Sequence, residues 1–282
     1  MVEIAARPRG PYSLALSARL AGDATRSVRD GLVTARCGGG VARAFQSRDG
    51  TVTIRSESAT AAGKLRWMLA LDDDHAEFLR RFANDPLVGR ATKHLRGLRP
   101  IRTATVAQAL LRAVCGQLID SKTARRLERS VTRALSPPDP DGLSEPPSTA
   151  ALATAAPFEL RRLGLHERRG SAIVRLCRSL DLERLHELPT DAVVRRLERE
   201  RGLGPWSAGV VCLEGLGRYE HGLVGDLGLV KLVRALRGRR VVETWETAEL
   251  LEPYGEWAGL ASVYLLAGFG RGLIPLPAPR AA

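Results

Sequence analysis

Aromatic residues and long apolar runs are scarce in this chain. Phe, Trp and Tyr together make up 5% of its 282 residues. The longest apolar run, residues 257–268, is too short to cross a bilayer. The amino-terminal sequence MVEIAARPRGPYS lacks the apolar core of a signal peptide. We therefore expect a soluble, cytoplasmic protein with no membrane partner.

Cysteine is also scarce, and the four that occur are far apart: Cys37, Cys115, Cys177 and Cys212. None belongs to a C-x-x-C pair, which excludes a zinc site of that type and a disulfide scaffold. Each lies beside apolar residues. We expect them to be small buried hydrophobic residues in a reducing compartment.

Acidic residues are outnumbered by basic ones. The chain has 43 Lys and Arg against 31 Asp and Glu, a net charge of +12. This excess favours a polyanionic partner. The length is sufficient for one large domain or two modest ones with ample core.

The first part of the chain predicts an antiparallel sheet of four or five strands. YSLALSARL alternates between apolar and polar residues. Asp49-Gly50 lies between VARAFQ and TVTIRS and is a strong hairpin signal. LRWMLAL, residues 65–71, is predicted as a further strand. We expect an N-terminal β domain over residues 1–71, with structural support as its role.

From Asp72 onward the pattern becomes helical, and residues 72–282 are predicted to form the second domain. Residues 136–148, SPPDPDGLSEPPS, are Pro-rich and polar, which indicates a surface loop between helical blocks. Beyond HAEFLRRFA, helices are expected at 106–118, 121–135, 150–155, 158–163, 167–180, 190–200, 205–216, 227–236, 245–251 and 257–269.

A helical hairpin is predicted over about residues 197–216. Gly202-Leu203-Gly204 forms a tight turn, and Pro205 occupies the first position of the next helix, where a missing N–H costs nothing. Trp206, Val210, Leu213 and Gly217 then recur on one helix face. Glycines let a ligand approach the backbone, and the free N–H groups at the helix start can hold one phosphate. The alternative is an ordinary turn between two helices.

Asp226 is the second feature, because it follows apolar Leu223 and Val224 and precedes a further amphipathic helix. One interpretation is a helix N-cap, a position that Asp favours. The other is a carboxylate held at the mouth of a cleft formed by the hairpin. The two roles are compatible.

These residues together resemble the helix-hairpin-helix DNA glycosylases, and most closely the bacterial alkylated-purine branch, DNA-3-methyladenine glycosylase II. The resemblance rests on L-G-x-W-[ST]-A at the hairpin and on an Asp that opens a helix about twenty residues later. Three further stretches support it: RAVCGQLIDSKTARRLERSV, LRRLGLHERRGSAIVRLCRSL and WAGLASVYLLAGF. It implies an α+β fold, in which a small N-terminal antiparallel β-sheet domain precedes a mainly α-helical helix-hairpin-helix glycosylase domain.

The resemblance implies a base-excision repair enzyme that flips an alkylated purine out of double-stranded DNA and hydrolyses its N-glycosidic bond. Asp226 would be the catalytic residue, stabilising the oxocarbenium-like state and orienting water. Bifunctional relatives carry a Lys in the hairpin helix where this chain has Trp206, so a monofunctional hydrolase is expected. Excision of a deaminated or oxidised base, and a non-catalytic DNA-binding role, are the alternatives.

The DNA contacts implied by the resemblance surround the hairpin. Leu118 would be the wedge that fills the gap left by the flipped base, with Gln117 beside it; alternatively, Leu118 is a buried helix end and Gln117 satisfies a loop backbone. Contacts to DNA would come from Gln117, Leu118, Gly202, Leu203, Gly204 and Trp206. The base pocket would be lined by Trp206, Val210 and Leu266. Trp206 is either a core residue or a π-face for the base.

No cofactor is expected to be required. Some relatives bind a monovalent cation, Na⁺ or K⁺, through hairpin carbonyls, which here would belong to Glu198, Glu200 and Leu203. Some also carry an iron–sulfur cluster on four closely spaced cysteines after the catalytic region. No Cys follows Cys212, so no such cluster is expected. The partner is double-stranded DNA with a damaged base, bound by a monomer.

Overall fold

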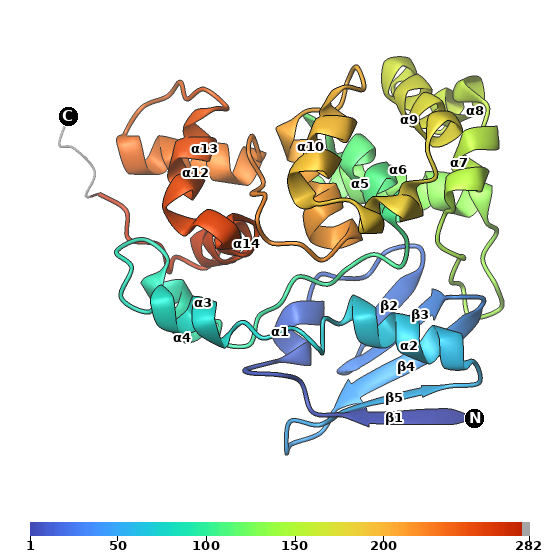
Figure 1. Ribbon diagram of the computed structural model, residues 1–282, viewed down its shortest axis with the longest axis horizontal. Coiled ribbons are helices and arrows are strands. Elements are labelled where there is room, and N and C mark those ends of the chain that lie inside the picture. Colours follow the sequence, from blue (N-terminus) through green and yellow to red (C-terminus); the bar gives the residue numbers. More distant parts are fainter. Residues whose placement is uncertain (278–282) are drawn as a thin grey trace.

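The computed structural model describes residues 1–277; residues 278–282, the end of the second predicted domain, lie outside this part. An N-terminal antiparallel sheet lies below the helices in Figure 1, and its strand order is β1-β5-β4-β3-β2. Within the described chain the predicted four or five strands are confirmed as five: β1 (Val2–Ala6), β2 (Arg26–Arg29), β3 (Leu32–Cys37), β4 (Gly40–Gln46) and β5 (Val52–Ser56).

The hairpin predicted at Asp49-Gly50 joins β4 to β5, where Gln46 pairs with Val52. The Asp49 carboxylate stabilises this turn, because Oδ1 accepts hydrogen bonds from the Ser47 hydroxyl at 2.6 Å and from the Thr51 N–H at 3.1 Å. The side chain thus replaces backbone partners that the turn residues lack.

Two of the predicted strands are wrong, because both segments are helices. Residues 65–71 lie mostly within α2 (Ala59–Met68), and YSLALSARL contains α1 (Leu14–Ala18). Each helix begins after a serine, Ser58 or Ser13, whose side chain accepts a hydrogen bond from the N–H three residues on. The apolar residues of α2 are spaced to lie on one helix face. This face packs against the sheet, which α2 covers (Figure 1). Capping and the helical period outweighed the local alternation.

The helical part forms two lobes (Figure 1). The first has its own core and contains α5 (Val106–Gly116), α6 (Ser121–Leu135), α7 (Thr149–Thr154), α8 (Pro157–Arg162), α9 (Glu167–Ser179), η1 (Leu182–Glu187), α10 (Thr190–Glu198), α11 (Pro205–Val210) and η2 (Val211–Gly215). The second lobe has a separate hydrophobic core. It contains α3 (Ala76–Arg81), α4 (Gly89–His94), α12 (Leu227–Arg237), α13 (Glu246–Leu251), η3 (Glu252–Trp257) and α14 (Ala258–Phe269).

Most predicted helices are confirmed, with small shifts at their ends. The helix at 121–135 matches residue for residue, and the Pro-rich segment 136–148 is a loop. The helix predicted at 205–216 is α11 followed by a π-helical turn, η2. The short helix α4 was not predicted, because six residues carry too little periodicity.

The basic segment of residues 95–102 joins α4 to α5, and two of its arginines, Arg99 and Arg102, are buried. Arg99 donates to the carbonyl of Ala70 at 2.5 Å, and Arg102 pairs with Asp73 at 2.5 Å. Arg102 also donates to the carbonyl of Trp67 at 3.3 Å. These bonds fix the sheet unit against the helices, so that all three units surround one cavity.

The four cysteines are buried and free, as predicted. Burial raises the pKa of the Cys37 and Cys212 thiols to about 12, which keeps them protonated and unreactive. None of the helices in the described part of the chain has the length and apolarity to span a bilayer.

Candidate functional site

A cavity of about 970 Å³ opens where the sheet unit and the two helical lobes meet. Its lining includes most of the residues singled out from the sequence: Gln117, Leu118, Gly202, Gly204, Trp206, Val210, Asp226 and Leu266. These residues come from four separate parts of the chain. The fold therefore brings the predicted wedge, hairpin, pocket and carboxylate around one space.

Three predicted residues do not line this cavity: Glu198, Glu200 and Leu203. The Leu203 side chain is buried in the core of the first lobe. Only its backbone can face a ligand. The Glu200 carboxylate pairs with Arg175 at 2.5 Å on the outer surface. The predicted roles of all three concern main-chain atoms, which these positions leave possible.

The hairpin turn is closed by a hydrogen bond from the Leu203 N–H to the carbonyl of Glu200 at 3.0 Å. Gly202 has φ +101°, a conformation that other residues rarely adopt. Pro205 opens α11, as predicted, and the first helical hydrogen bond runs from Ala208 to the carbonyl of Gly204.

Gly204 has no structural requirement for glycine within the protein. Its φ of −122° is ordinary, and a Cβ built on it would meet no atom within 4 Å. The open space beside it belongs to the cavity. A glycine here keeps the backbone accessible from outside rather than relieving strain inside.

Gln117, which follows α5, contacts the hairpin directly. Its Nε2 donates to the carbonyl of Gly202 at 2.7 Å and to the hydroxyl of Ser207 at 3.0 Å. The alternative that Gln117 satisfies a loop backbone is therefore seen in the free protein. These bonds tie the α5–α6 turn to the hairpin.

Leu118 projects into solvent at the cavity edge, with 81% of its surface exposed. Its φ is +57°, which is uncommon for any residue but glycine, Asn or Asp. The interpretation as a buried helix end is wrong. An exposed leucine on a strained backbone suggests a functional constraint.

Asp226 is both an N-cap and a cavity residue. Its Oδ1 accepts hydrogen bonds from the N–H groups of Gly228 at 2.7 Å and Leu229 at 3.3 Å. Its Oδ2 accepts one from the indole Nε1 of Trp206 at 3.1 Å. Both oxygens are thereby oriented.

The hydrogen bond between Trp206 and Asp226 was not predicted from the sequence. Trp206 was considered as a core residue or a π-face, and the ring is indeed partly buried against the second core. The indole also positions the carboxylate, twenty residues away in sequence. The spacing between the hairpin and Asp226 was the one signal in the sequence. It does not show in which direction either side chain points.

The middle of the cavity is apolar, with Val210 and Leu266 on its walls. Trp206 is the aromatic side chain among the described residues that line it. Such a space accepts a flat heterocycle. The carboxylate at its mouth can stabilise positive charge or activate a water molecule.

A charged cluster at the deeper end was also missed. Arg112 contacts Asp23 at 2.6 Å, Glu128 at 3.0 Å and Glu214 at 2.5 Å. Burial raises the pKa of Asp23, but Arg26 and Arg112 outweigh it and the net shift is downward. Because these residues are distant in sequence, no local pattern connects them.

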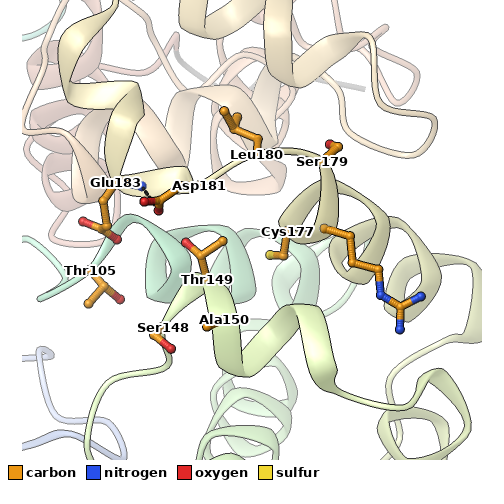
Figure 2. Close-up of a pocket in the computed structure, with 10 residues that line it drawn as sticks. Thr105, Ser148, Thr149, Ala150, Cys177, Ser179, Leu180, Asp181 and Glu183 are labelled. Atoms are coloured by element: carbon orange, nitrogen blue, oxygen red, sulfur yellow. Dashed lines mark hydrogen bonds between the residues drawn. The ribbon is translucent and has the colours of Figure 1, made fainter.

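A second cavity, of about 530 Å³, lies in the first lobe (Figure 2). Its polar side chains mainly cap helices. The Thr149 hydroxyl accepts from the N–H of Leu182 at 3.1 Å, and Asp181 accepts from that of Glu183 at 3.2 Å. Glu183 itself accepts from the N–H of Val106 at 2.8 Å. These groups join helices and are not poised for chemistry.

No protein-family model matches the chain. A DNA-3-methyladenine glycosylase of Bacillus subtilis (strain 168) is 26% identical over 208 residues, which cover 69% of this chain and 67% of that protein. The structure of a 3-methyladenine DNA glycosylase from Archaeoglobus fulgidus superposes with a TM-score of 0.81 at 19% identity, covering 95% of this chain and 98% of the other.

An 8-oxoguanine glycosylase/lyase of Clostridium acetobutylicum is also similar. Its structure, in complex with double-stranded DNA containing cytosine opposite 8-oxoguanine, has a TM-score of 0.78 at 15% identity and covers 96% of this chain and 99% of that one. The sheet followed by helical lobes is thus common to proteins named for different bases.

Proposed function

We infer that this chain, which has the fold of the helix-hairpin-helix DNA glycosylase superfamily, is a base-excision repair DNA glycosylase that removes alkylated purines from double-stranded DNA. The observation that carries this proposal is the Asp226 carboxylate, which is held by Trp206 at 3.1 Å and lines a cavity together with the glycine hairpin. The relative named for 3-methyladenine supports the substrate class.

In the proposed reaction the damaged nucleotide is flipped into the cavity and its base is enclosed by Val210 and Leu266. As the bond to C1′ breaks, positive charge develops on the sugar. Asp226 stabilises that charge, orients water toward C1′ and accepts the proton that the water loses as its oxygen bonds to C1′. A cationic alkylated purine leaves as a neutral base, so one carboxylate suffices without a strong general acid.

The hairpin is proposed to bind the DNA backbone. The N–H groups of Gly204, Trp206 and Ser207 have no acceptor in the described part of the chain, and they lie at the positive end of the helix dipole. They suit one phosphate of any sequence. Leu118, exposed at the opposite edge, would enter the space that the flipped nucleotide leaves.

A monovalent cation at the hairpin carbonyls is retained as part of the proposal. The carbonyl of Glu200 already accepts one hydrogen bond, from Leu203. A carbonyl oxygen has a second lone pair, so Glu198, Glu200 and Leu203 together can hold Na⁺ or K⁺. The ion would add positive charge next to the phosphate.

Base release from defined duplexes tests this function. The purified protein should release 3-methyladenine and 7-methylguanine from dimethyl sulfate-treated DNA in a time-dependent way, measured by chromatography of the free bases. A duplex containing 8-oxoguanine tests the second candidate, excision of an oxidised purine, which the likeness to the 8-oxoguanine glycosylase/lyase favours. Binding to DNA with no release of any base would leave only a binding role.

Borohydride trapping tests the expected monofunctional chemistry. A lyase forms a Schiff base between a lysine and C1′, which borohydride reduces to a stable protein–DNA adduct. We expect no adduct, because Trp206 occupies the hairpin-helix position of the lyase lysine. Lys231, on the exposed face of α12, also lines the cavity. An adduct that disappears in Lys231→Met would show that this lysine performs lyase chemistry and would refute the monofunctional assignment.

Gly204→Ala tests the phosphate clamp. Because the added methyl group meets no protein atom within 4 Å, the free energy of unfolding should stay the same or rise slightly. DNA affinity should fall by about ten-fold, since the methyl group occupies the approach to the N–H groups, at a loss of about one charge-assisted hydrogen bond. Fluorescence anisotropy with an abasic duplex measures this.

Gly63→Ala is the matched control, because Gly63 lies within α2 and its Cβ would also meet no neighbour. It should change neither DNA affinity nor base release. Equal affinities for the native protein and Gly204→Ala would show that the hairpin backbone does not contact DNA.

A further inference from the structure

One helix lines the cavity from its mouth to its floor. Trp206, Val210 and Glu214 all face it, at i, i+4 and i+8 along α11 and η2. Leu213, which the sequence placed with Trp206 and Val210 on a buried helix face, is buried in the second core as predicted. Glu214 faces the cavity, within the π-helical turn, and its side chain is 26% exposed. Such turns often occur at functional sites.

Glu214 is part of the charged cluster on the cavity floor. Arg112 contacts all three carboxylates there, those of Asp23, Glu128 and Glu214. The second guanidinium, of Arg26, pairs with Asp23 at 3.1 Å and donates to the carbonyls of Ala21 and Arg102. All five charged side chains line the cavity: Asp23, Arg26, Arg112, Glu128 and Glu214.

The ionised cluster has three negative and two positive groups, which leaves one negative charge in excess. The pKa of Glu128 is raised, because the effect of burial exceeds the opposing effect of Arg112. Both Glu128 oxygens accept hydrogen bonds from Arg112, at 3.1 and 3.2 Å to Nε, which favours the carboxylate form. Two exposed cations, Arg125 and Lys231, lie at the rim rather than the floor.

One acceptor on the floor has no partner in the described chain. Both oxygens of Asp23 and both of Glu128 accept protein hydrogen bonds. Glu214 Oε2 accepts from Arg112 at 2.5 Å, whereas no donor among residues 1–277 reaches Oε1. Because the side chain is partly exposed to the cavity, Oε1 is available to a bound molecule.

The N-terminal unit helps to close this space. Ser17, Leu20, Ala21 and Gly22, in and just after α1, form part of the cavity lining together with Asp23. The role expected from the sequence, structural support, is therefore too narrow. Asp23 reaches Arg112 from this unit and joins it to the floor of the site.

We propose, on the basis of the proposed glycosylase function, that Glu214 determines substrate specificity by binding the base edge remote from the sugar and favouring cationic alkylpurines. Glu214 lies eight residues beyond Trp206, which holds Asp226, on the same cavity-lining helix. A purine with C1′ at Asp226 that lies along this helix would therefore direct its far edge toward Glu214. Both 3-methyladenine and 7-methylguanine carry N–H donors on that edge, which Oε1 can accept. The excess negative charge stabilises a cationic base in a partly desolvated site.

The same charge acts against neutral purines. A neutral base accumulates negative charge as its bond to C1′ breaks, unless it is protonated, and a nearby carboxylate opposes that charge. An alkylated cationic base loses positive charge but does not become negative. Glu214 therefore favours one class of leaving group in the transition state and disfavours the other.

Glu214→Gln tests this inference, because glutamine keeps the size and a carbonyl acceptor but removes the charge. We expect kcat/KM for release of 3-methyladenine and 7-methylguanine to fall by about ten-fold or more, the effect of one hydrogen bond to a charged group. Hypoxanthine, a neutral purine, also carries an N–H on that edge and loses the same hydrogen bond, but its departure is no longer opposed by the carboxylate charge. Its release should therefore stay within about three-fold of the native rate or rise. The ratio of the two rates does not depend on the folded fraction.

Two variants serve as controls. Glu252→Gln removes an exposed carboxylate away from the cavity, and it should leave the ratio unchanged. Glu214→Asp keeps the charge and should recover part of the preference. A ratio in Glu214→Gln equal to that of the native protein would overturn the inference while leaving the proposed function intact. No release of methylated bases by the native protein would instead refute the proposed function itself.

Discussion

Asp226→Asn is expected to abolish release of methylated bases while leaving the fold and DNA affinity nearly unchanged. Asparagine caps helices about as well as aspartate, so its oxygen can keep the bonds to Gly228 and Leu229. Its amide NH₂ would then face the Trp206 indole N–H, donor against donor, and the bond at 3.1 Å would be lost.

The rate should fall by about a thousand-fold or more, the range produced by removing one pre-organised electrostatic group from an active site. Single-turnover release from methylated duplex measures the rate, and anisotropy measures binding. Affinity should be equal or slightly higher, because a negative charge near DNA is removed. The melting temperature should change by no more than a few degrees, as for a substitution between good capping residues.

Asp181→Asn provides the matched control. Asp181 caps the helix η1 at the second cavity, away from the proposed site (Figure 2). It should retain native activity. If Asp226→Asn kept more than about a tenth of the native rate, the carboxylate would not be the catalytic group, and the assignment of the whole site would fail.

The hairpin and the capping role of Asp226 could be predicted from the sequence because both depend on local chemistry. Proline at a helix start, glycine in a tight turn and aspartate before a helix each act within a few residues. The same reasoning was wrong over residues 65–71, where the apolar segment LRWMLAL was predicted as a strand although Ser58, seven residues before Leu65, caps the helix that contains most of it. Short apolar segments do not determine their own period.

The cavity floor could not be predicted, because its charges come from distant parts of the chain. Asp23, Arg112 and Glu128 each belong to segments that read as ordinary polar helix or turn positions. One signal was available at Glu214, the lone charged residue between Trp206 and Arg218. A charged residue in an otherwise apolar helix indicates either a buried ion pair or a binding site. The tertiary structure shows that Glu214 both pairs with Arg112 and lines the cavity.

Arg112→Met is expected to be the most destabilising of the substitutions considered. Methionine preserves much of the side-chain length but leaves Asp23, Glu128 and Glu214 without their shared partner. Breaking a buried ion pair by removing one member costs about 3–5 kcal/mol. For a protein of this size that corresponds to a melting temperature lower by roughly ten degrees. Differential scanning calorimetry measures it.

The control is Arg161→Met, which breaks the exposed pair between Arg161 and Glu167 at 3.1 Å. Exposed pairs contribute little, and the free energy of unfolding should change by less than about 1 kcal/mol. If Arg112→Met were as stable as this control, the cluster would not be a strongly coupled buried network.

The loss of unfolding free energy in Arg112→Met should become smaller as the pH falls. In the native protein the pKa of Asp23 is lowered, against the effect of burial, by Arg26 and Arg112. Its stabilising contribution is therefore present above the ordinary carboxyl pKa and is lost as the pH falls through the lowered value. Without Arg112, the effect of burial is opposed less, so the carboxyl pKa values rise. The variant should then regain stability relative to the native protein as the pH falls from neutral toward the acid range, because the carboxylates become protonated. A deficit that grew on acidification would contradict the assignment of Arg112 as the counter-charge that allows three carboxylates to face the cavity.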